Sequence, residues 1–463
     1  MSHGTESRVR ATQAPVEIGR QVIALGRGLE ADLEAYVQSG RTVTVKVYGR
    51  QVESVSVAEP RGLGLRAVRG GMTGYAFTTD VSREGLDRVL AEAESDLEAS
   101  DSDPFAGLPS KPAEPYPDLP GLWRPGTSLL LLEQKIALAL EAEAAALGPA
   151  GVETVEESVY SDEEARVAVV SSCGIEVETE QSYSFVYVVA HAGVGADRQS
   201  GLGFSAHRDP RELDPEAAGR EAAGKALALV GARPCPTGAY TVVLDREVAA
   251  ALLSTLAGAL SAEAVQKGRS VFAGKLGEMI GSAGVTLVDD GLDLDGVATS
   301  PFDAEGVPQQ ITALVEKGRL KSYLFDSQSA RREGGTAHST GSARRASYRA
   351  LPRVGPSNLV VASGSGTLEE LLQRVGDGLY VEGVAGLHSG VNPMSGEISL
   401  GVTGRLIKGG SVAAAVREVT MATDFAGLLD GICDVGGDAR QIPLHGSVCS
   451  PSIAVRGVTV SGA

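Results

Sequence analysis

A proline-rich stretch constrains the fold of this 463-residue chain more than any other feature of its sequence. Seven prolines stand between residues 100 and 125, at positions 104, 109, 112, 115, 117, 120 and 125. Each proline fixes φ and removes a backbone donor, so the stretch can form neither a regular helix nor an inner strand. We therefore predict an extended connector at 100–126, which follows an N-terminal domain at 1–99.

The N-terminal domain combines a helical pattern with strand patterns. From residue 15 to 37, apolar side chains recur three and four positions apart, which predicts an opening helix. These side chains are Val22, Leu25, Leu29, Leu33 and Val37. Alternating runs then continue to Phe77 and predict a small antiparallel sheet. Asp80 or Ser82 can cap the helix that follows.

A second break, at Pro234 and Pro236, divides the rest of the chain. Before it, a middle α+β domain at 127–235 should contain a helix at 128–147, a strand pair turning near Cys173, and a helix capped by Asp214. After it, the domain at 236–463 shows one apolar helix, at 248–265, among short strands and glycine turns. The absence of regular βαβ alternation indicates the α+β class, with a β-rich C-terminal domain around one buried helix.

Charge and composition exclude several classes of function. The formal net charge is -18, which repels phosphate backbones and argues against nucleic acid as a partner. No apolar run approaches the roughly 20 residues that cross a bilayer, and the N-terminus does not resemble a signal peptide. Four scattered cysteines do not make a disulfide framework. We expect a soluble, cytoplasmic protein that contacts no membrane and has reduced thiols.

The sequence contains no helix-borne zinc motif. The six histidines lie far apart, and none is followed by glutamate. The densest set of ligand-type residues is near the C-terminus and consists of Cys433, Asp434, Asp438, His445 and Cys449. Its spacing fits no compact zinc site, so a polar loop with free thiols is the favoured interpretation. The glycines before Thr367 likewise precede a capping box with Glu370 rather than a phosphate loop.

An arginine-rich segment at 331–353 contrasts with the acidic chain. Its arginines are Arg331, Arg332, Arg344, Arg345, Arg349 and Arg353. A flexible basic loop of this kind can hold carboxylates or phosphates by bidentate contacts. An ordinary solvated surface loop is the alternative. We predict Arg344 and Arg345 as substrate contacts, with His338 at the loop tip.

Several stretches resemble the TldD/PmbA family, most closely its TldE (PmbA) branch. The strongest are HSGVNPMSGEISLGVTGRLIKGG at 388–410 and VREVTMATDFAGLLDGI at 416–432. Further matches, in the order of the family, are RGLGLRAVRGGMTGYAFTTD at 61–80, DPFAGLP at 103–109, GRSVFAGKLGE at 268–278, PFDAEGVP at 301–308 and DSQSARR at 326–332. Together they span nearly the whole chain.

The resemblance also locates where a metal site would be. In the catalytic branch of the family, a helix before the GRSVF-like segment carries HExxxH, and a cysteine near the C-terminus completes the site. Those histidine, glutamate and histidine positions fall here on Leu253, Ser254 and Gly258. The cysteine falls on or near Val435, with Cys433 close by. The resemblance thus implies a chain without catalytic or metal-ligating residues and without a cofactor of its own.

The family further implies a role for such a chain. It would be the noncatalytic subunit of a heteromeric metalloprotease, in which a TldD-type subunit with HExxxH carries the zinc and the complex processes unfolded peptides. We expect the C-terminal domain to make the subunit contact, and the isolated chain to form a homodimer or to be less stable alone. Two alternatives remain open: a stand-alone regulator of the gyrase-modulator type, and an enzyme that uses Cys433, His445 and Cys449.

Overall fold

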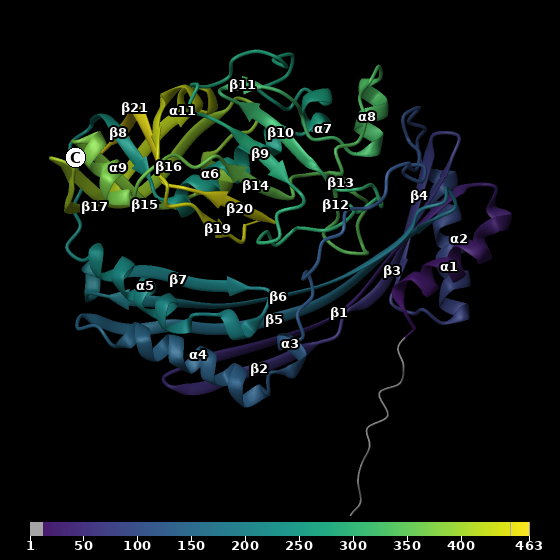
Figure 1. Ribbon diagram of the computed structural model, residues 1–463, viewed down its shortest axis with the longest axis horizontal. Helices are drawn as coiled ribbons and strands as arrows, with labels where there is room; N and C mark the ends of the chain where they lie inside the picture. The colour runs from purple at the N-terminus through teal and green to yellow at the C-terminus, as the bar shows by residue number, and fades with distance from the viewer. Residues whose placement is uncertain (1–12, 445, 463) are drawn as a thin grey trace, which may run out of the picture.

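The computed structural model describes residues 13–444 and 446–462. A long, curved sheet forms one side of the molecule, and a C-terminal domain packs inside its curve (Figure 1). The helices of the first half of the chain cover the face of the sheet that points away from the C-terminal domain. β3 (Arg61–Arg69) and the first half of β1 (Asp32–Tyr48) are therefore buried on both faces, whereas β2 (Gln51–Ala58) is exposed.

The long sheet joins the N-terminal and middle parts of the chain. Its strands are β1 Asp32–Tyr48, β2 Gln51–Ala58, β3 Arg61–Arg69, β4 Met72–Thr78, β5 Val152–Ser171, β6 Glu176–Ala192 and β7 Gln199–His207. The order is β4-β3-β1-β5-β6-β7, and β2 pairs with the second half of β1. β1 pairs antiparallel with β5 from Glu34 opposite Ser171 to Val47 opposite Ser158. All neighbouring pairs in this sheet are antiparallel.

Helices at the two ends of the sheet shield its outer face. They are α1 Pro15–Leu25, α2 Arg83–Ala99, α3 Gly126–Leu129, α4 Leu132–Leu147 and α5 Pro215–Ala228, with short 3-10 turns η1 Gly26–Leu29, η2 Gly195–Asp197 and η3 Pro210–Glu212. The predicted caps are confirmed. Ser82 accepts from the Gly85 N–H at 3.2 Å, and Asp214 from the Ala217 N–H at 2.8 Å.

The opening helix is shorter than predicted. α1 ends at Leu25, a 3-10 turn follows, and Glu30 adopts a left-handed φ of 50°. Leu33 and Val37 lie in β1, so the prediction of one helix over 15–37 was wrong beyond its first half. Of the predicted connector at 100–126, residues 100–125 form neither helix nor strand, and α3 begins at its last residue, Gly126.

Two six-stranded sheets build the C-terminal domain. One has the order β11-β10-β9-β14-β20-β19 and the other β17-β16-β15-β8-β21-β18; an additional pairing of β17 with β21 closes the second into a barrel. The strands are β8 Gly238–Leu244, β9 Leu287–Asp290, β10 Ile311–Glu316, β11 Arg319–Leu320, β14 Asn358–Val361, β15 Gly378–Ala385, β16 Glu397–Lys408, β17 Ser411–Asp424, β18 Ile432–Val435, β19 Arg440–Ile442, β20 Ser447–Ser450 and β21 Ile453–Ser461. A short ribbon pairs β12 Ala343–Arg344 with β13 Arg353–Val354.

One helix, α6 Arg246–Ala259, lies inside this domain and contacts strands of both sheets. Eight of its residues are buried, which confirms the predicted buried helix. The remaining helices are short: α7 Ala262–Gln266, α8 Ser327–Glu333, α9 Leu368–Val375, α10 Leu387–Gly390 and α11 Phe425–Gly431. The α+β class is confirmed. No helix in the described part of the chain is long and apolar enough to cross a membrane.

Candidate functional site

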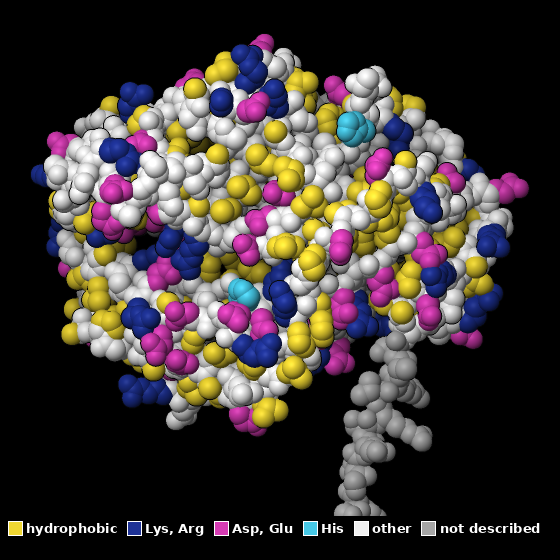
Figure 2. Space-filling model, in the orientation of Figure 1, with side chains coloured by type: hydrophobic (Ala, Val, Ile, Leu, Met, Phe, Trp, Pro, Cys, Tyr) yellow, Lys and Arg dark blue, Asp and Glu magenta, His cyan; other side chains and the backbone are white. Residues whose placement is uncertain are grey.

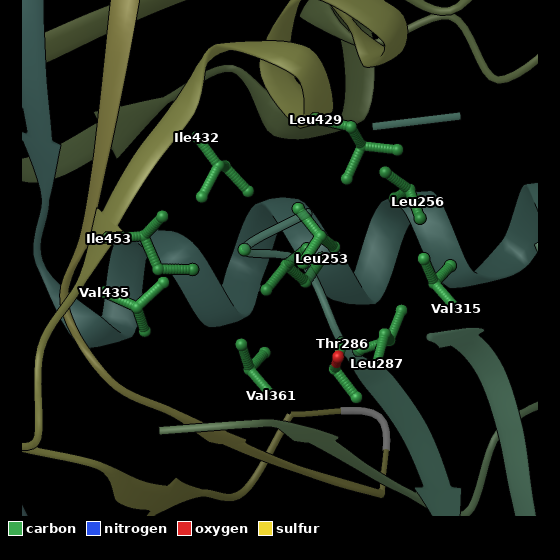
Figure 3. Close-up of a pocket in the computed structure, with 12 residues that line it drawn as sticks. Leu253, Leu256, Thr286, Leu287, Val315, Val361, Leu429, Ile432, Val435 and Ile453 are labelled. Atoms are coloured by element: carbon green, nitrogen blue, oxygen red, sulfur yellow. The ribbon is translucent and has the colours of Figure 1, made fainter. Parts of the chain in front are cut away.

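The structure brings Leu253 and Val435 together, the positions where the family resemblance places the first histidine and the cysteine. Leu253 on α6 is 4% exposed. It points into a small cavity that Val435, at the end of β18, also lines (Figure 3). The other walls are almost entirely aliphatic and come from Leu256, Gly284, Val285, Thr286, Leu287, Val315, Val361, Leu429, Ile432 and Ile453.

This cavity does not fit a metal ion. Its volume is about 10 Å³, near the lower limit for a single water, and its only polar side chain is that of Thr286. Zinc needs typically three nitrogen, sulfur or oxygen ligands and, when catalytic, a position for water. Leu253 and Val435 supply neither ligand nor space. At this place the residues form hydrophobic core instead.

The other two motif positions lie outside the cavity. Ser254 is half-buried and Gly258 is exposed. A Cβ atom built on Gly258 would meet no atom within 4 Å, so its side of α6 opens to free space. No carboxylate stands at the Ser254 position to serve as a general base.

The cysteine-rich C-terminal segment is engaged in structural contacts. Cys433 is exposed on β18, where its thiol faces the Ala454 carbonyl at 3.5 Å. Cys449 lies on β20, in the other sheet. Partial desolvation by neighbouring residues raises the pKa of both thiols, which makes them poorer metal ligands and nucleophiles.

The neighbouring acids of that segment are occupied as well. Asp434 pairs with Arg374, and Asp438 accepts hydrogen bonds from the backbone and hydroxyl of Ser452. His445 lies outside the described residues. Among residues 13–444 and 446–462, no three His, Cys, Asp or Glu side chains cluster in a way that could hold a metal.

The arginine-rich segment is not a free loop. Arg331, on α8, donates to the carbonyl oxygens of Phe105 at 2.8 Å and Gly107 at 2.7 Å, and Arg332 pairs with Asp103. These contacts attach the proline-rich connector to the C-terminal domain. The prediction of a flexible loop was wrong for Arg331 and Arg332, which lie on α8 and bind a segment more than 200 positions away. No local pattern reveals these partners.

Arg345 is enclosed between the two halves of the molecule. Its side chain is 0% exposed and is paired with Glu34 of β1. Its guanidinium also lies 4.9 Å from the centre of the Tyr36 ring and 5.9 Å from that of Tyr75, both cation–π distances. These contacts give Arg345 a structural role. His338, by contrast, is exposed, with its Nδ1 3.3 Å from the Thr336 carbonyl.

Arg344, the neighbour of Arg345, has different surroundings. Its guanidinium is buried, yet Nε and Nη2 find no hydrogen-bond partner among the described residues. Two buried acids lie near it. Burial raises the pKa of Asp289 to about 6, and burial with the nearby Glu305 raises that of Asp303 to about 7. The sequence predicted the same role for Arg344 and Arg345, but in the structure only Arg345 is paired with a glutamate.

A wider cleft, of about 580 Å³, lies between the β7 edge of the long sheet, with the start of α5, and the C-terminal domain. Figure 2 shows this hollow, with basic and acidic side chains interspersed around it. On its wall Arg440 donates to Glu221 at 2.8 Å and lies 3.9 Å over the Phe204 ring. The side chain of Arg208 donates to backbone carbonyl oxygens, including that of Leu294 at 3.1 Å. Both arginines thus connect residues on opposite walls of the cleft.

The chain matches three domains of one family in order. Residues 33–96 match PmbA/TldA metallopeptidase domain 1, 129–230 the central domain and 237–462 the C-terminal domain. An uncharacterized protein of Methanocaldococcus jannaschii is 28% identical over 95% of this chain and 99% of its own length. Metalloprotease PmbA of Escherichia coli O157:H7 is 27% identical over 94% of each chain.

Solved structures give the same result. The crystal structure of a protein from Thermotoga maritima, described as a modulator of a DNA gyrase, superposes with a TM-score of 0.87 at 27% identity, over 96% of this chain and 99% of that chain. TldE from Thermococcus kodakarensis shares the fold with a TM-score of 0.87 at 22% identity, over 96% and 100% of the two chains. From sequence and fold together, the chain belongs to the TldD/PmbA metallopeptidase family.

Proposed function

We propose that this chain is the noncatalytic, TldE-like subunit of a heteromeric zinc metalloprotease that processes unfolded peptides in the cytoplasm. The observation that carries the proposal is the packing of Leu253 against the aliphatic cavity that Val435 also lines. A metallopeptidase needs a bound zinc ion and a base for its water. Where the family has its first histidine and its cysteine, this chain has apolar core, and no ligand or base stands at Ser254 or Gly258, so the zinc belongs to a TldD-type partner with HExxxH.

The surface suggests how a partner subunit would dock. β2 is exposed along all eight of its residues, and among the described residues only β1 pairs with it. Val55 stands opposite Val45 and Val57 opposite Val43, and both β1 valines are buried on the helix-covered face of the sheet. On β2 this face of the sheet carries apolar side chains that nothing covers, and β2 also has one unpaired edge. Both features favour association with another protein chain.

This surface changes the expected location of the subunit contact. The sequence suggested the C-terminal domain, whereas β2 belongs to the N-terminal part. A metal-bearing subunit of the same family is the occupant that the proposal requires. An isolated chain would cover the strand with a second copy of itself.

The test combines composition with activity. Purified from its native cytoplasm, the chain should carry with it a TldD-type subunit at equal abundance. Alone, the chain should contain no stoichiometric zinc and should cleave no unfolded peptide. The reconstituted pair should contain zinc and cleave the peptide. About one tightly held zinc per isolated chain, with chelator-sensitive cleavage, would contradict the proposal.

The alternative is a stand-alone regulator of the gyrase-modulator type, which the description of the Thermotoga maritima neighbour supports. With a net charge of -18, such a regulator would contact a basic protein surface rather than DNA. The same purification separates the two functions. Recovery of a basic protein without HExxxH, and no TldD-type chain, would favour the regulator.

A further inference from the structure

Three polar side chains on neighbouring strands of the long sheet form a continuous chain of hydrogen bonds. His191 of β6 lies with its Nε2 2.8 Å from Oε2 of Glu156 on β5, and with its Nδ1 3.0 Å from Oγ of Ser200 on β7. His191 stands directly opposite Ser200, and the pairing of β6 with β7 has no bulge. Carboxylate, imidazole and hydroxyl thus follow one another as in the acid, base and nucleophile of serine hydrolases.

The carboxylate of Glu156 sets the direction of these hydrogen bonds. An ionised carboxylate can only accept, so Nε2 of His191 donates to it. In the neutral imidazole the other nitrogen, Nδ1, then has a free lone pair and accepts from the hydroxyl group of Ser200. The Ser200 proton therefore has a base in place, which is the condition for a serine oxygen to act as a nucleophile.

Ser200 is open to solvent, whereas the histidine beside it is enclosed. The side chain of His191 is 10% exposed, and Ser200 is exposed. A Cβ atom on Gly201 would meet the carbonyl oxygen of Ala222 on α5 at 2.2 Å. Because side chains alternate along a strand, Ser200 and Leu202 point away from α5, to the inner face of the sheet. Leu202 is 42% exposed there and can contact a short acyl chain.

The open edge of β7 supplies a donor for an oxyanion. Among the described residues β7 pairs only with β6 (Figure 1). The carbonyl oxygen of Phe204 accepts from Arg440, which lies outside the long sheet, and therefore points away from β6. Backbone groups alternate between the two sides of a strand, so the N–H of Ser200, four residues earlier, faces the same open edge. Acyl-transfer sites use a backbone N–H of this kind, next to the nucleophile, to stabilise the tetrahedral intermediate.

We propose that Ser200 is a nucleophile that hydrolyses small carboxylic esters, with His191 as its base and Glu156 as the residue that positions the imidazole. Oγ attacks the ester carbonyl carbon, Nδ1 takes the hydroxyl proton, and the carbonyl oxygen becomes an oxyanion next to the Ser200 N–H. The intermediate then expels the alcohol, which takes the proton from Nδ1. Water attacks the acyl group in the same way, so the acid is released and Ser200 is restored.

This activity goes beyond the proposed function and is independent of it, because it needs neither zinc nor a second subunit. It requires no deep pocket, since the substrate is a small ester with a short acyl chain. The site also differs from the family's metal position, since Glu156, His191 and Ser200 lie on the long sheet and Leu253 lies inside the C-terminal domain.

The purified full-length chain, kept in EDTA, tests the site with p-nitrophenyl acetate as substrate and a fluorophosphonate as covalent probe. Hydrolysis should saturate with substrate, and peptide mapping by mass spectrometry should find the phosphonyl group on Ser200, where Oγ has displaced fluoride. Absence of saturable hydrolysis, or a Ser200 without label, would overturn the proposal and leave the three side chains as a contact between strands. No metal or partner is used, so neither result bears on subunit assembly or zinc content.

Three variants separate catalysis from structure. Ser200→Ala removes an exposed hydroxyl group, so it should fold, lose the label and lower kcat at least tenfold. Ser56→Ala, at an exposed serine of β2, should behave as wild type. Glu156→Gln keeps the size of the side chain but no longer fixes Nε2 as the donor, so kcat should fall at least tenfold with KM unchanged. Melting curves check that each variant folds, and an unchanged kcat in Ser200→Ala would overturn the proposal.

Discussion

Arg66 of β3 donates from Nη2 to Glu305 at 2.9 Å, across the interface between the long sheet and the C-terminal domain. The same nitrogen lies 2.6 Å from Glu34, which is also paired with Arg345. All four side chains are at most 7% exposed. Two arginines and two glutamates therefore neutralise each other in the interior and connect parts of the chain more than 200 residues apart.

Removal of one member of this network should be costly. Glu305→Ala leaves a net positive charge buried with Arg66 and Arg345, and we expect a loss of about 3–5 kcal/mol in the free energy of unfolding, measured in urea. Asp87→Ala is the matched control, because it breaks an exposed pair with Arg83 and should cost less than about 1 kcal/mol. Similar losses in both variants would show that the buried network contributes nothing specific.

The raised pKa of Asp303 predicts a dependence of stability on pH. Burial, together with Glu305, raises this pKa to about 7, against about 4 in an unfolded chain. Between these values the folded state holds a proton that the unfolded state has released. The contribution of Asp303 to the free energy of unfolding is therefore largest below about pH 4 and decreases as the pH rises to about 7.

The Asp303→Asn variant isolates this effect, since its amide does not titrate. The stability of wild type relative to the variant should decrease between pH 5 and pH 8, measured by urea unfolding at each pH. Asp87→Asn, at an exposed acid, controls for the change of charge. A difference between wild type and Asp303→Asn that stays constant with pH would contradict the raised pKa.

The parts of the fold that local signals determine could be predicted. Ser82 and Asp214 cap helices, and Thr367 with Glu370 forms the predicted capping box, because these contacts span three residues. The spacing of Leu33 and Val37 resembled that of a helix because β1 is buried on both faces in its first half, from Leu33 to Val37. A strand in the middle of a covered sheet does not alternate apolar with polar residues, so its period is lost.

Long-range pairing explains what the sequence could not indicate. β1 and β5 pair over a separation of more than 100 residues, and no residue pattern states that the N-terminal and middle parts share one sheet. Arg344 and Arg345 are the same residue type in adjacent positions. Only the tertiary structure pairs Arg345 with Glu34, whereas Arg344 forms no hydrogen bond with a carboxylate among the described residues. The apolar character of α6 around Leu253, however, was evident from the sequence.

The exposed strand β2 should mediate association. Val55 and Val57 are 40% and 54% exposed, and charges there would oppose the burial of this face. We expect Val55→Lys with Val57→Lys to weaken binding to a TldD-type subunit, or self-association of the isolated chain, by at least tenfold in light-scattering titrations. Val412→Lys changes a valine of β17 that is also 40% exposed and tests the C-terminal domain. If only Val412→Lys weakened binding, the subunit contact would lie on the C-terminal domain and not on β2.

Two substitutions on α6 distinguish packing from a concealed metal site. Leu253→His places an imidazole in a cavity whose only polar side chain is Thr286, and we expect a loss of about 2–4 kcal/mol in the free energy of unfolding. Gly258→Ala adds a methyl group where nothing lies within 4 Å, and should raise that free energy by about 0.5–1 kcal/mol because alanine favours the helix. Urea unfolding, with and without added zinc, measures both. If α6 retained a usable metal position, Leu253→His would be tolerated and zinc would stabilise it; if it is hydrophobic core, zinc leaves the unfolding midpoint of each variant unchanged.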